Sequence, residues 1–121
     1  MSEALVTFFS AWSETDPSAR GELIVKAMTG GATYADPRSG ERLKGHDAIA
    51  DYVGMFSANA PGWTAEVVKA DNCIGYVRAI VKFGGKGPDG KEMAQYGMYC
   101  ADTNSDGLIV SMVGFVGETP S

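Results

Sequence analysis

The side chains best suited to chemistry in this sequence are the carboxylate of Asp36, directly before Pro37, and the imidazole of His46. A carboxylate that faces an apolar pocket can abstract a proton from the carbon next to a carbonyl group. An Asp before a Pro also commonly accepts hydrogen bonds from the amides of its own turn, so both roles stay open for Asp36. His46 is the only histidine, and it falls where a helix is expected to begin, which favours an exposed side chain without a catalytic role.

The composition excludes several other kinds of site. One histidine and two cysteines, Cys73 and Cys100, are too few for a zinc site or a disulfide framework, so we expect no metal. The net charge of −5 disfavours binding to nucleic acid. No apolar run reaches the roughly 18 residues of a membrane span, and the first residues lack the basic start of a signal peptide. Unpaired cysteines then favour the reducing cytoplasm.

The first half of the sequence has the pattern of three helices and one short extended piece. The apolar side chains of residues 5–12 recur with the period of a helix. An Asp-Pro pair at residues 16–17 is a typical helix start, and we expect the glycine pair at 30–31 to end this second helix. Residues 33–36 are expected to be extended, and a third helix is expected from about 46 to 57.

The second half has the pattern of four strands joined by hairpins, because β-branched and aromatic residues alternate with clusters of turn residues. The strands are expected at residues 64–70, 73–83, 92–101 and 108–116. The turns between them are expected at residues 71–72, 84–90 and 103–107.

This order of elements predicts an α+β fold, with three N-terminal helices packed on a curved, mainly antiparallel sheet. The helices and the twisted sheet enclose a cone-shaped space, which is either filled by side chains or left as a ligand pocket. Small residues at Gly75, Ala79 and Gly97 either leave room on the concave face, which favours a cavity, or mark bulges. No repeat, low-complexity tract or linker interrupts the sequence, so we expect one domain over residues 1–121.

Three segments point to a known superfamily. They are Tyr34-Ala35-Asp36-Pro37, Gly45-His46-Asp47-Ala48-Ile49 and Ile109-Val110-Ser111-Met112. Together with the element order, they resemble the nuclear transport factor 2-like superfamily, and within it the SnoaL-like and ketosteroid-isomerase-like branch. The resemblance extends from about Leu5 to Gly117 and implies a cone-shaped, cystatin-like roll. Members of this superfamily differ widely in activity, so the resemblance implies the fold more strongly than the function.

The resemblance also implies roles for individual residues. Ketosteroid isomerases use an Asp as general base, and a Tyr and a protonated Asp as donors to the oxyanion. Asp36 occupies the position of the base, whereas Phe8 occupies that of the Tyr and cannot donate a hydrogen bond. Tyr99 occupies the position of the second Asp and can donate. Steroid isomerisation is therefore doubtful. Tyr99 equally fits a core aromatic whose hydroxyl reaches a strand edge. Either role depends on the strand register, because a slip of one residue would turn Tyr99 outward.

Strand alternation also divides the sheet into two faces. If Val77 faces the pocket, then Tyr76, Arg78, Ile80 and Lys82 lie on the opposite face. In the superfamily this outer face often forms a dimer interface, and a mixed surface of this kind fits one. We therefore expect a homodimer through the outer face of the sheet.

The leading functional interpretation is a cofactor-independent isomerase, cyclase or dehydratase that acts by proton transfer on a small, apolar or amphipathic carbonyl compound. Asp36 would move the proton and Tyr99 would polarise the carbonyl. The side chains expected to line the pocket are Phe8, Trp12, Val53, Phe56, Val77, Met112 and Val116. Each of these could equally be ordinary core.

The alternative is a non-catalytic domain that binds a small ligand or a partner chain, which the missing donor at Phe8 supports. The loop at residues 38–44 also leaves two interpretations open. Its three cations either draw an anionic ligand toward the pocket mouth or are simply solvated.

Overall fold

The structure, a computed structural model, describes residues 3–87 and 89–116. The helices of these residues are α1 (Glu3–Ser13), α2 (Pro17–Ala27) and α3 (His46–Asn59). The strands are β1 (Met28–Ala35), β2 (Leu43–Lys44), β3 (Thr64–Cys73), β4 (Tyr76–Lys86), β5 (Glu92–Thr103) and β6 (Ile109–Val116). The strands form one sheet in the order β2-β1-β6-β5-β4-β3.

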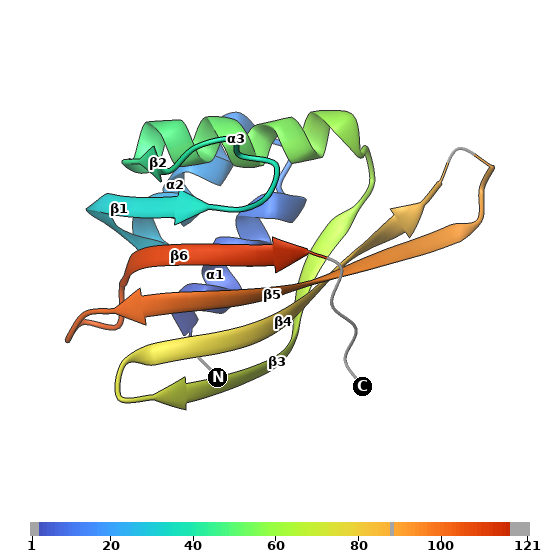
Figure 1. The fold of residues 1–121 in the computed structure, drawn as a ribbon. Helices are drawn as coiled ribbons and strands as arrows, with labels where there is room; N and C mark the ends of the chain where they lie inside the picture. The colour runs from blue at the N-terminus through green and yellow to red at the C-terminus, as the bar shows by residue number, and fades with distance from the viewer. Residues whose placement is uncertain (1–2, 88, 117–121) are drawn as a thin grey trace.

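The expected α+β architecture is confirmed. Figure 1 shows the three helices along one face of a strongly twisted sheet, with the ends of β4 and β5 projecting beyond the helices. The β1–β6 pair is parallel, and the other neighbouring strands are antiparallel. The helices and the curved sheet together form the expected cone.

The first two helices follow from local sequence. The apolar residues of α1 bury one face, and Asp16 caps α2 by accepting a hydrogen bond from the Ser18 amide at 3.3 Å. The prediction that Gly30 and Gly31 end α2 is wrong: the helix ends at Ala27, and both glycines lie in β1. The pairing of β1 with β6 shifts register between Met28 and Thr33, and glycine suits such an irregular stretch of strand.

The first hairpin turn also differs from the prediction. Residues 71–72 belong to β3, and the turn lies at Ile74 and Gly75, whose φ angles are 50° and 87°. Two consecutive positive φ angles are what a two-residue hairpin requires, because they match the twist of the flanking strands. Gly75 therefore shapes a turn and leaves no room on the concave face.

The register of the central strands decides which side chains face the helices. Val77 is buried, as are the other alternate residues of β4, whereas Arg78 is exposed and forms an ion pair with Asp71 at 2.9 Å. On β5, the pairing of Tyr99 with Ala79 turns the Tyr99 ring into the core. The core is rich in packed aromatic rings, including Phe8, Phe9, Trp12, Tyr34, Phe83 and Tyr99.

Two kinds of feature are absent from the residues that the structure describes. None of their helices is long and apolar enough to cross a membrane. Nor do they contain a group of three or more His, Cys, Asp or Glu side chains that could hold a metal ion.

Candidate functional site

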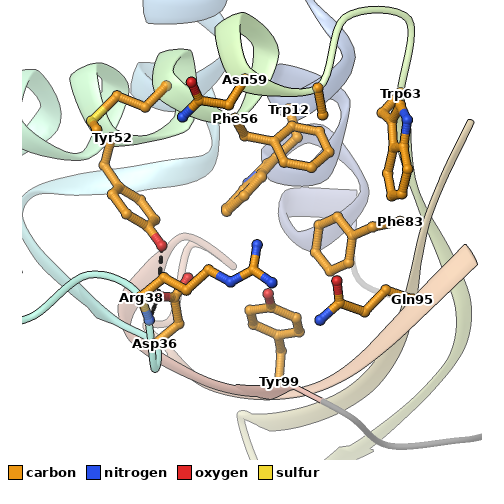
Figure 2. Close-up of a pocket in the computed structure, with 12 residues that line it drawn as sticks. Trp12, Asp36, Arg38, Tyr52, Phe56, Asn59, Trp63, Phe83, Gln95 and Tyr99 are labelled. Carbon is orange, nitrogen blue, oxygen red and sulfur yellow. Dashed lines mark hydrogen bonds between the residues drawn. The ribbon is translucent and has the colours of Figure 1, made fainter. Parts of the chain in front are cut away.

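A cavity of about 460 Å³ lies between α3, the loop after β1 and the concave face of the sheet. Its walls are mainly aromatic, but charged and amide side chains also reach it, as Figure 2 shows. The lining residues are Trp12, Asp36, Arg38, Tyr52, Met55, Phe56, Asn59, Ala60, Trp63, Phe83, Gln95 and Tyr99. The cavity therefore combines flat apolar walls with a few polar groups, which is the usual make-up of a small-molecule site.

The carboxylate of Asp36 is held by four hydrogen bonds. Its Oδ1 accepts from the Tyr52 hydroxyl at 2.6 Å and from the backbone amides of Arg38 at 2.9 Å and Ser39 at 2.8 Å. Its Oδ2 accepts from the Tyr34 hydroxyl at 2.7 Å. Asp36 thus makes the turn contacts expected of an Asp before a Pro and also lines the cavity.

Local structure explains how these groups meet. Tyr34 lies in β1 and Asp36 directly follows the strand, so their two-residue spacing puts both side chains on one side of the chain. Tyr52 comes from α3, on the flank of the face that buries Ile49 and Val53. The packing of α3 against β1 therefore brings the Tyr52 hydroxyl to the carboxylate.

Tyr99 stands at the floor of the cavity. Its ring stacks on that of Tyr34, with centroids 6.5 Å apart. A Cβ atom at Gly114 would overlap the Tyr99 ring, and one at Gly97 would lie 3.0 Å from it. The prediction that Gly97 leaves empty space is therefore wrong: the rings of Tyr99 and Phe83 fill it.

Burial keeps the hydroxyls of this cluster protonated. It is the main cause that raises the pKa of Tyr34, Tyr52 and Tyr99, and the negative charge of Asp36 raises all three further. The guanidinium of Arg38 opposes this effect by lowering the pKa of Tyr52 and Tyr99. At neutral pH the cluster therefore supplies hydrogen-bond donors around one carboxylate.

The residues singled out in the sequence fall into two groups. Asp36, Tyr99, Trp12 and Phe56 come together around the cavity. The others proposed as lining belong to the core or lie beyond the described side chains. Phe8, Val53, Val77 and Met112 are buried in the core and do not line the cavity, because α1 and α3 pack directly on the sheet; the Val116 side chain lies outside the described part of the chain.

His46 also differs from the prediction, because it is half-buried rather than exposed. Its Nε2–H donates to the Met28 carbonyl at 2.9 Å, so it ties the start of α3 to the start of β1. It does not belong to the cavity lining.

Several residues of the site escaped the sequence analysis. Tyr34 carried a usable signal, because residues two apart in a strand share a face with Asp36. Tyr52 lies within the third helix that the sequence predicts, but no pattern indicated that it would reach Asp36. No local sequence pattern marked Trp63 or Gln95 as lining residues, because their distance from the cavity depends on how far the sheet curves over α3.

The model of the SnoaL-like domain family matches residues 5–112. This chain belongs to the SnoaL-like family. It therefore falls within the nuclear transport factor 2-like superfamily, as the sequence segments implied. No protein of curated function matches the chain significantly.

Solved structures agree with this assignment. A candidate isomerase of the SnoaL-like family from Agrobacterium tumefaciens is 24% identical, with 95% of each chain covered and a TM-score of 0.80. A candidate SnoaL-like polyketide cyclase from Jannaschia is 15% identical, with 94% of this chain and 83% of that chain covered and a TM-score of 0.76. A ketosteroid-isomerase-like protein from Catenulispora acidiphila, solved with trimethylamine, is 20% identical, with 93% and 83% covered and a TM-score of 0.75. At these identities the likeness concerns the fold.

Proposed function

We propose that this SnoaL-like protein is a cofactor-independent isomerase, cyclase or dehydratase that acts by proton transfer on a small carbonyl compound. The observation that carries the proposal is that Asp36 and Tyr99 line one cavity with largely aromatic walls. The relatives described as a candidate isomerase and a candidate polyketide cyclase support the same range of reactions.

In the proposed reaction, the carboxylate of Asp36 takes a proton from the carbon next to the substrate carbonyl. The C–H electron pair moves to the carbonyl oxygen, and the enolate that forms accepts a hydrogen bond from the Tyr99 hydroxyl. Within the described residues, Oδ2 of Asp36 accepts one hydrogen bond and Oδ1 accepts three, so Oδ2 has the free capacity to take the proton.

The fate of the enolate determines the product. Return of the proton to a different carbon gives an isomer, attack of the enolate carbon on a second carbonyl closes a ring, and loss of a β-hydroxyl group as water completes a dehydration. The aromatic walls fit the apolar part of such a substrate and limit access of water. Tyr34 and Tyr52 hold the carboxylate in place through their hydroxyl groups.

Proton abstraction can be tested without knowing the natural substrate. A panel of cyclic enones and 1,3-diketones is incubated with the protein in D₂O, and deuterium uptake next to the carbonyl is followed by NMR. Asp36→Asn should slow enzyme-dependent uptake by about 10²–10⁴-fold, because the base is lost. Tyr99→Phe should slow it by about 10²–10³-fold, because the enolate loses a donor.

Matched controls separate these effects from damage to the fold. Asp51→Asn changes an exposed carboxylate next to Tyr52, and Tyr76→Phe changes an exposed tyrosine on the other face of the sheet. Both controls should exchange like the wild type, and circular dichroism should show every variant folded. Wild-type rates in a folded Asp36→Asn variant would contradict the assignment of the base.

The alternative function is binding of a small ligand without catalysis. The observation that favours it is the engagement of Asp36 in four hydrogen bonds, two of them to amides of its own turn. If compounds of the panel bind to the wild type but none exchanges faster than in buffer, the binding function replaces the catalytic one.

We also propose that the protein forms a homodimer through the outer face of its sheet. This face exposes the apolar side chains of Tyr76, Val110, Val113 and Phe115. Exposed apolar groups gathered on one sheet face commonly mark a protein interface.

A further inference from the structure

The charge pattern of the cavity indicates the class of its ligand. Asp36 and Arg38 are the two charged residues among its lining. The carboxylate of Asp36 has four hydrogen-bond partners, whereas the guanidinium of Arg38 has neither a hydrogen bond nor an ion pair within the described part of the chain. The negative group of the cavity is therefore satisfied internally, and the positive group is left without a partner.

The position of Arg38 makes this charge available to a ligand. Its backbone amide is fixed by the bond to Asp36, and Figure 2 shows its guanidinium extending over the cavity toward Tyr99. The effect of Arg38 on the pKa of both Tyr52 and Tyr99 agrees with a location close to the two hydroxyl groups. A planar guanidinium with free N–H groups is well matched to the two oxygens of a carboxylate.

One further donor beside the cavity lacks a partner among the described residues. Trp12 is 4% exposed, lines the cavity, and has a buried indole N–H with no acceptor in the described residues. The ring of Phe56 packs against that of Trp12, with centroids 5.3 Å apart. By contrast, the Trp63 N–H already donates to the Lys86 carbonyl at 3.2 Å. The cavity thus offers the guanidinium of Arg38 to an oxygen-bearing ligand, whereas the Trp12 N–H beside it is buried.

We propose that the substrate is a flat, conjugated molecule that carries a carboxylate, and that Arg38 binds this carboxylate at the cavity mouth. The rings of Trp12, Phe56 and Phe83 would hold the flat part, with its carbonyl region between Asp36 and Tyr99. This inference rests on the proposed function because it places the substrate in the same cavity. Its test measures binding alone and needs no turnover.

Two probes of the same shape and different charge test the inference. Binding of 2-naphthoate and 2-naphthamide is measured by calorimetry and by tryptophan fluorescence. We expect the wild type to bind the naphthoate about three- to tenfold more tightly than the naphthamide, with the preference weakening as salt is raised. Arg38→Gln should remove the preference, because it deletes the charge and keeps the backbone amide.

The matched control is Arg42→Gln, which removes an exposed charge from the same loop at a residue that does not line the cavity. This variant should keep the preference for the naphthoate. Equal binding of the two probes by the wild type, an unchanged preference in Arg38→Gln, or no binding of either probe at millimolar concentration would overturn the inference.

The outcomes distinguish this inference from the proposed function. Selective binding of the naphthoate without deuterium exchange on any ketone would support the ligand class and reject the catalytic role. Exchange on neutral ketones, together with no preference for the naphthoate, would support the catalytic role and reject the carboxylate.

Discussion

Tyr34 links the two residues on which the proposed chemistry depends. It is 1% exposed, donates to Asp36 and stacks on Tyr99. Tyr52 in α3 donates to the same carboxylate, so two tyrosines bind Asp36 and the third, Tyr99, stacks on one of them. Asp36 is half-buried, and these donors offset the cost of withdrawing its charge partly from water.

The buried tyrosines predict a loss of stability at high pH. Both Tyr34 and Tyr99 have a pKa raised above the ordinary value of 10.0 in the folded protein, mainly by burial. Below pH 10 both are protonated in the folded and unfolded chains, so their contribution is complete. Above pH 10 the unfolded chain releases these protons first, and the free energy of unfolding should fall by at most about 1.4 kcal/mol per pH unit for each tyrosine.

Denaturant unfolding followed between pH 8 and about pH 11 measures this slope. Tyr99→Phe removes one titrating group. The free energy of unfolding of this variant should therefore fall less steeply with pH, by the contribution of one tyrosine. Stability that stays constant through this range in the wild type would contradict the burial of these hydroxyls.

The β3–β4 hairpin contains a strained residue. Ile74 has a φ of 50°, a region that a β-branched side chain rarely adopts, and it is 94% exposed. Its neighbour Gly75 is well suited to the turn, and the Gly75 carbonyl accepts bonds from the amide and the hydroxyl of Thr103. The pairing of β3 with β4 and the bonds from Thr103 therefore keep Ile74 in this strained conformation.

Ile74→Asn should raise the free energy of unfolding by about 1 kcal/mol, because Asn adopts positive φ more readily and no buried contact is lost. Thermal or denaturant unfolding measures the difference. Ile74→Val keeps the β-branch and should give no gain. A loss of stability in Ile74→Asn, or an equal gain in both variants, would show that the turn is not strained at this residue.

The outer face of the sheet is the surface through which we propose that two copies of the chain pair. Phe115 on β6 is 54% exposed there, and Val25 on α2 is 56% exposed on the helical layer. If two copies pair through their sheets, Phe115→Asp places a charge in the interface, whereas Val25→Asp leaves it unchanged.

Light scattering coupled to size-exclusion chromatography should give the mass of two chains for the wild type and for Val25→Asp. Phe115→Asp should give the mass of one chain, because a buried charge without a partner opposes association. A wild type with the mass of one chain at micromolar concentration, or a Phe115→Asp variant that stays paired, would contradict the proposed interface.

Local patterns predicted much of the fold. The helical period of residues 5–12, the Asp16 cap and the alternation along β4 and β5 depend on near neighbours, and each agrees with the structure. Several of the predictions that differ concern glycines. Gly30, Gly31 and Gly75 were assigned from general preference, but strand pairing with β6 and the true hairpin turn decided their roles.

The site required contacts between distant parts of the chain. Asp36 could be selected from its own segment, because the chemistry of a carboxylate before a Pro is local. Its bond to Tyr52 joins residues 16 apart, and the floor at Tyr99 depends on the register of β5. A shift of one residue in that register would have turned Tyr99 outward with no change in composition. The resemblance of short segments therefore led to the family and a candidate base. The packing of α3 and β5 around that base created the cavity and its donors, and it left the Arg38 guanidinium without a partner among the described residues.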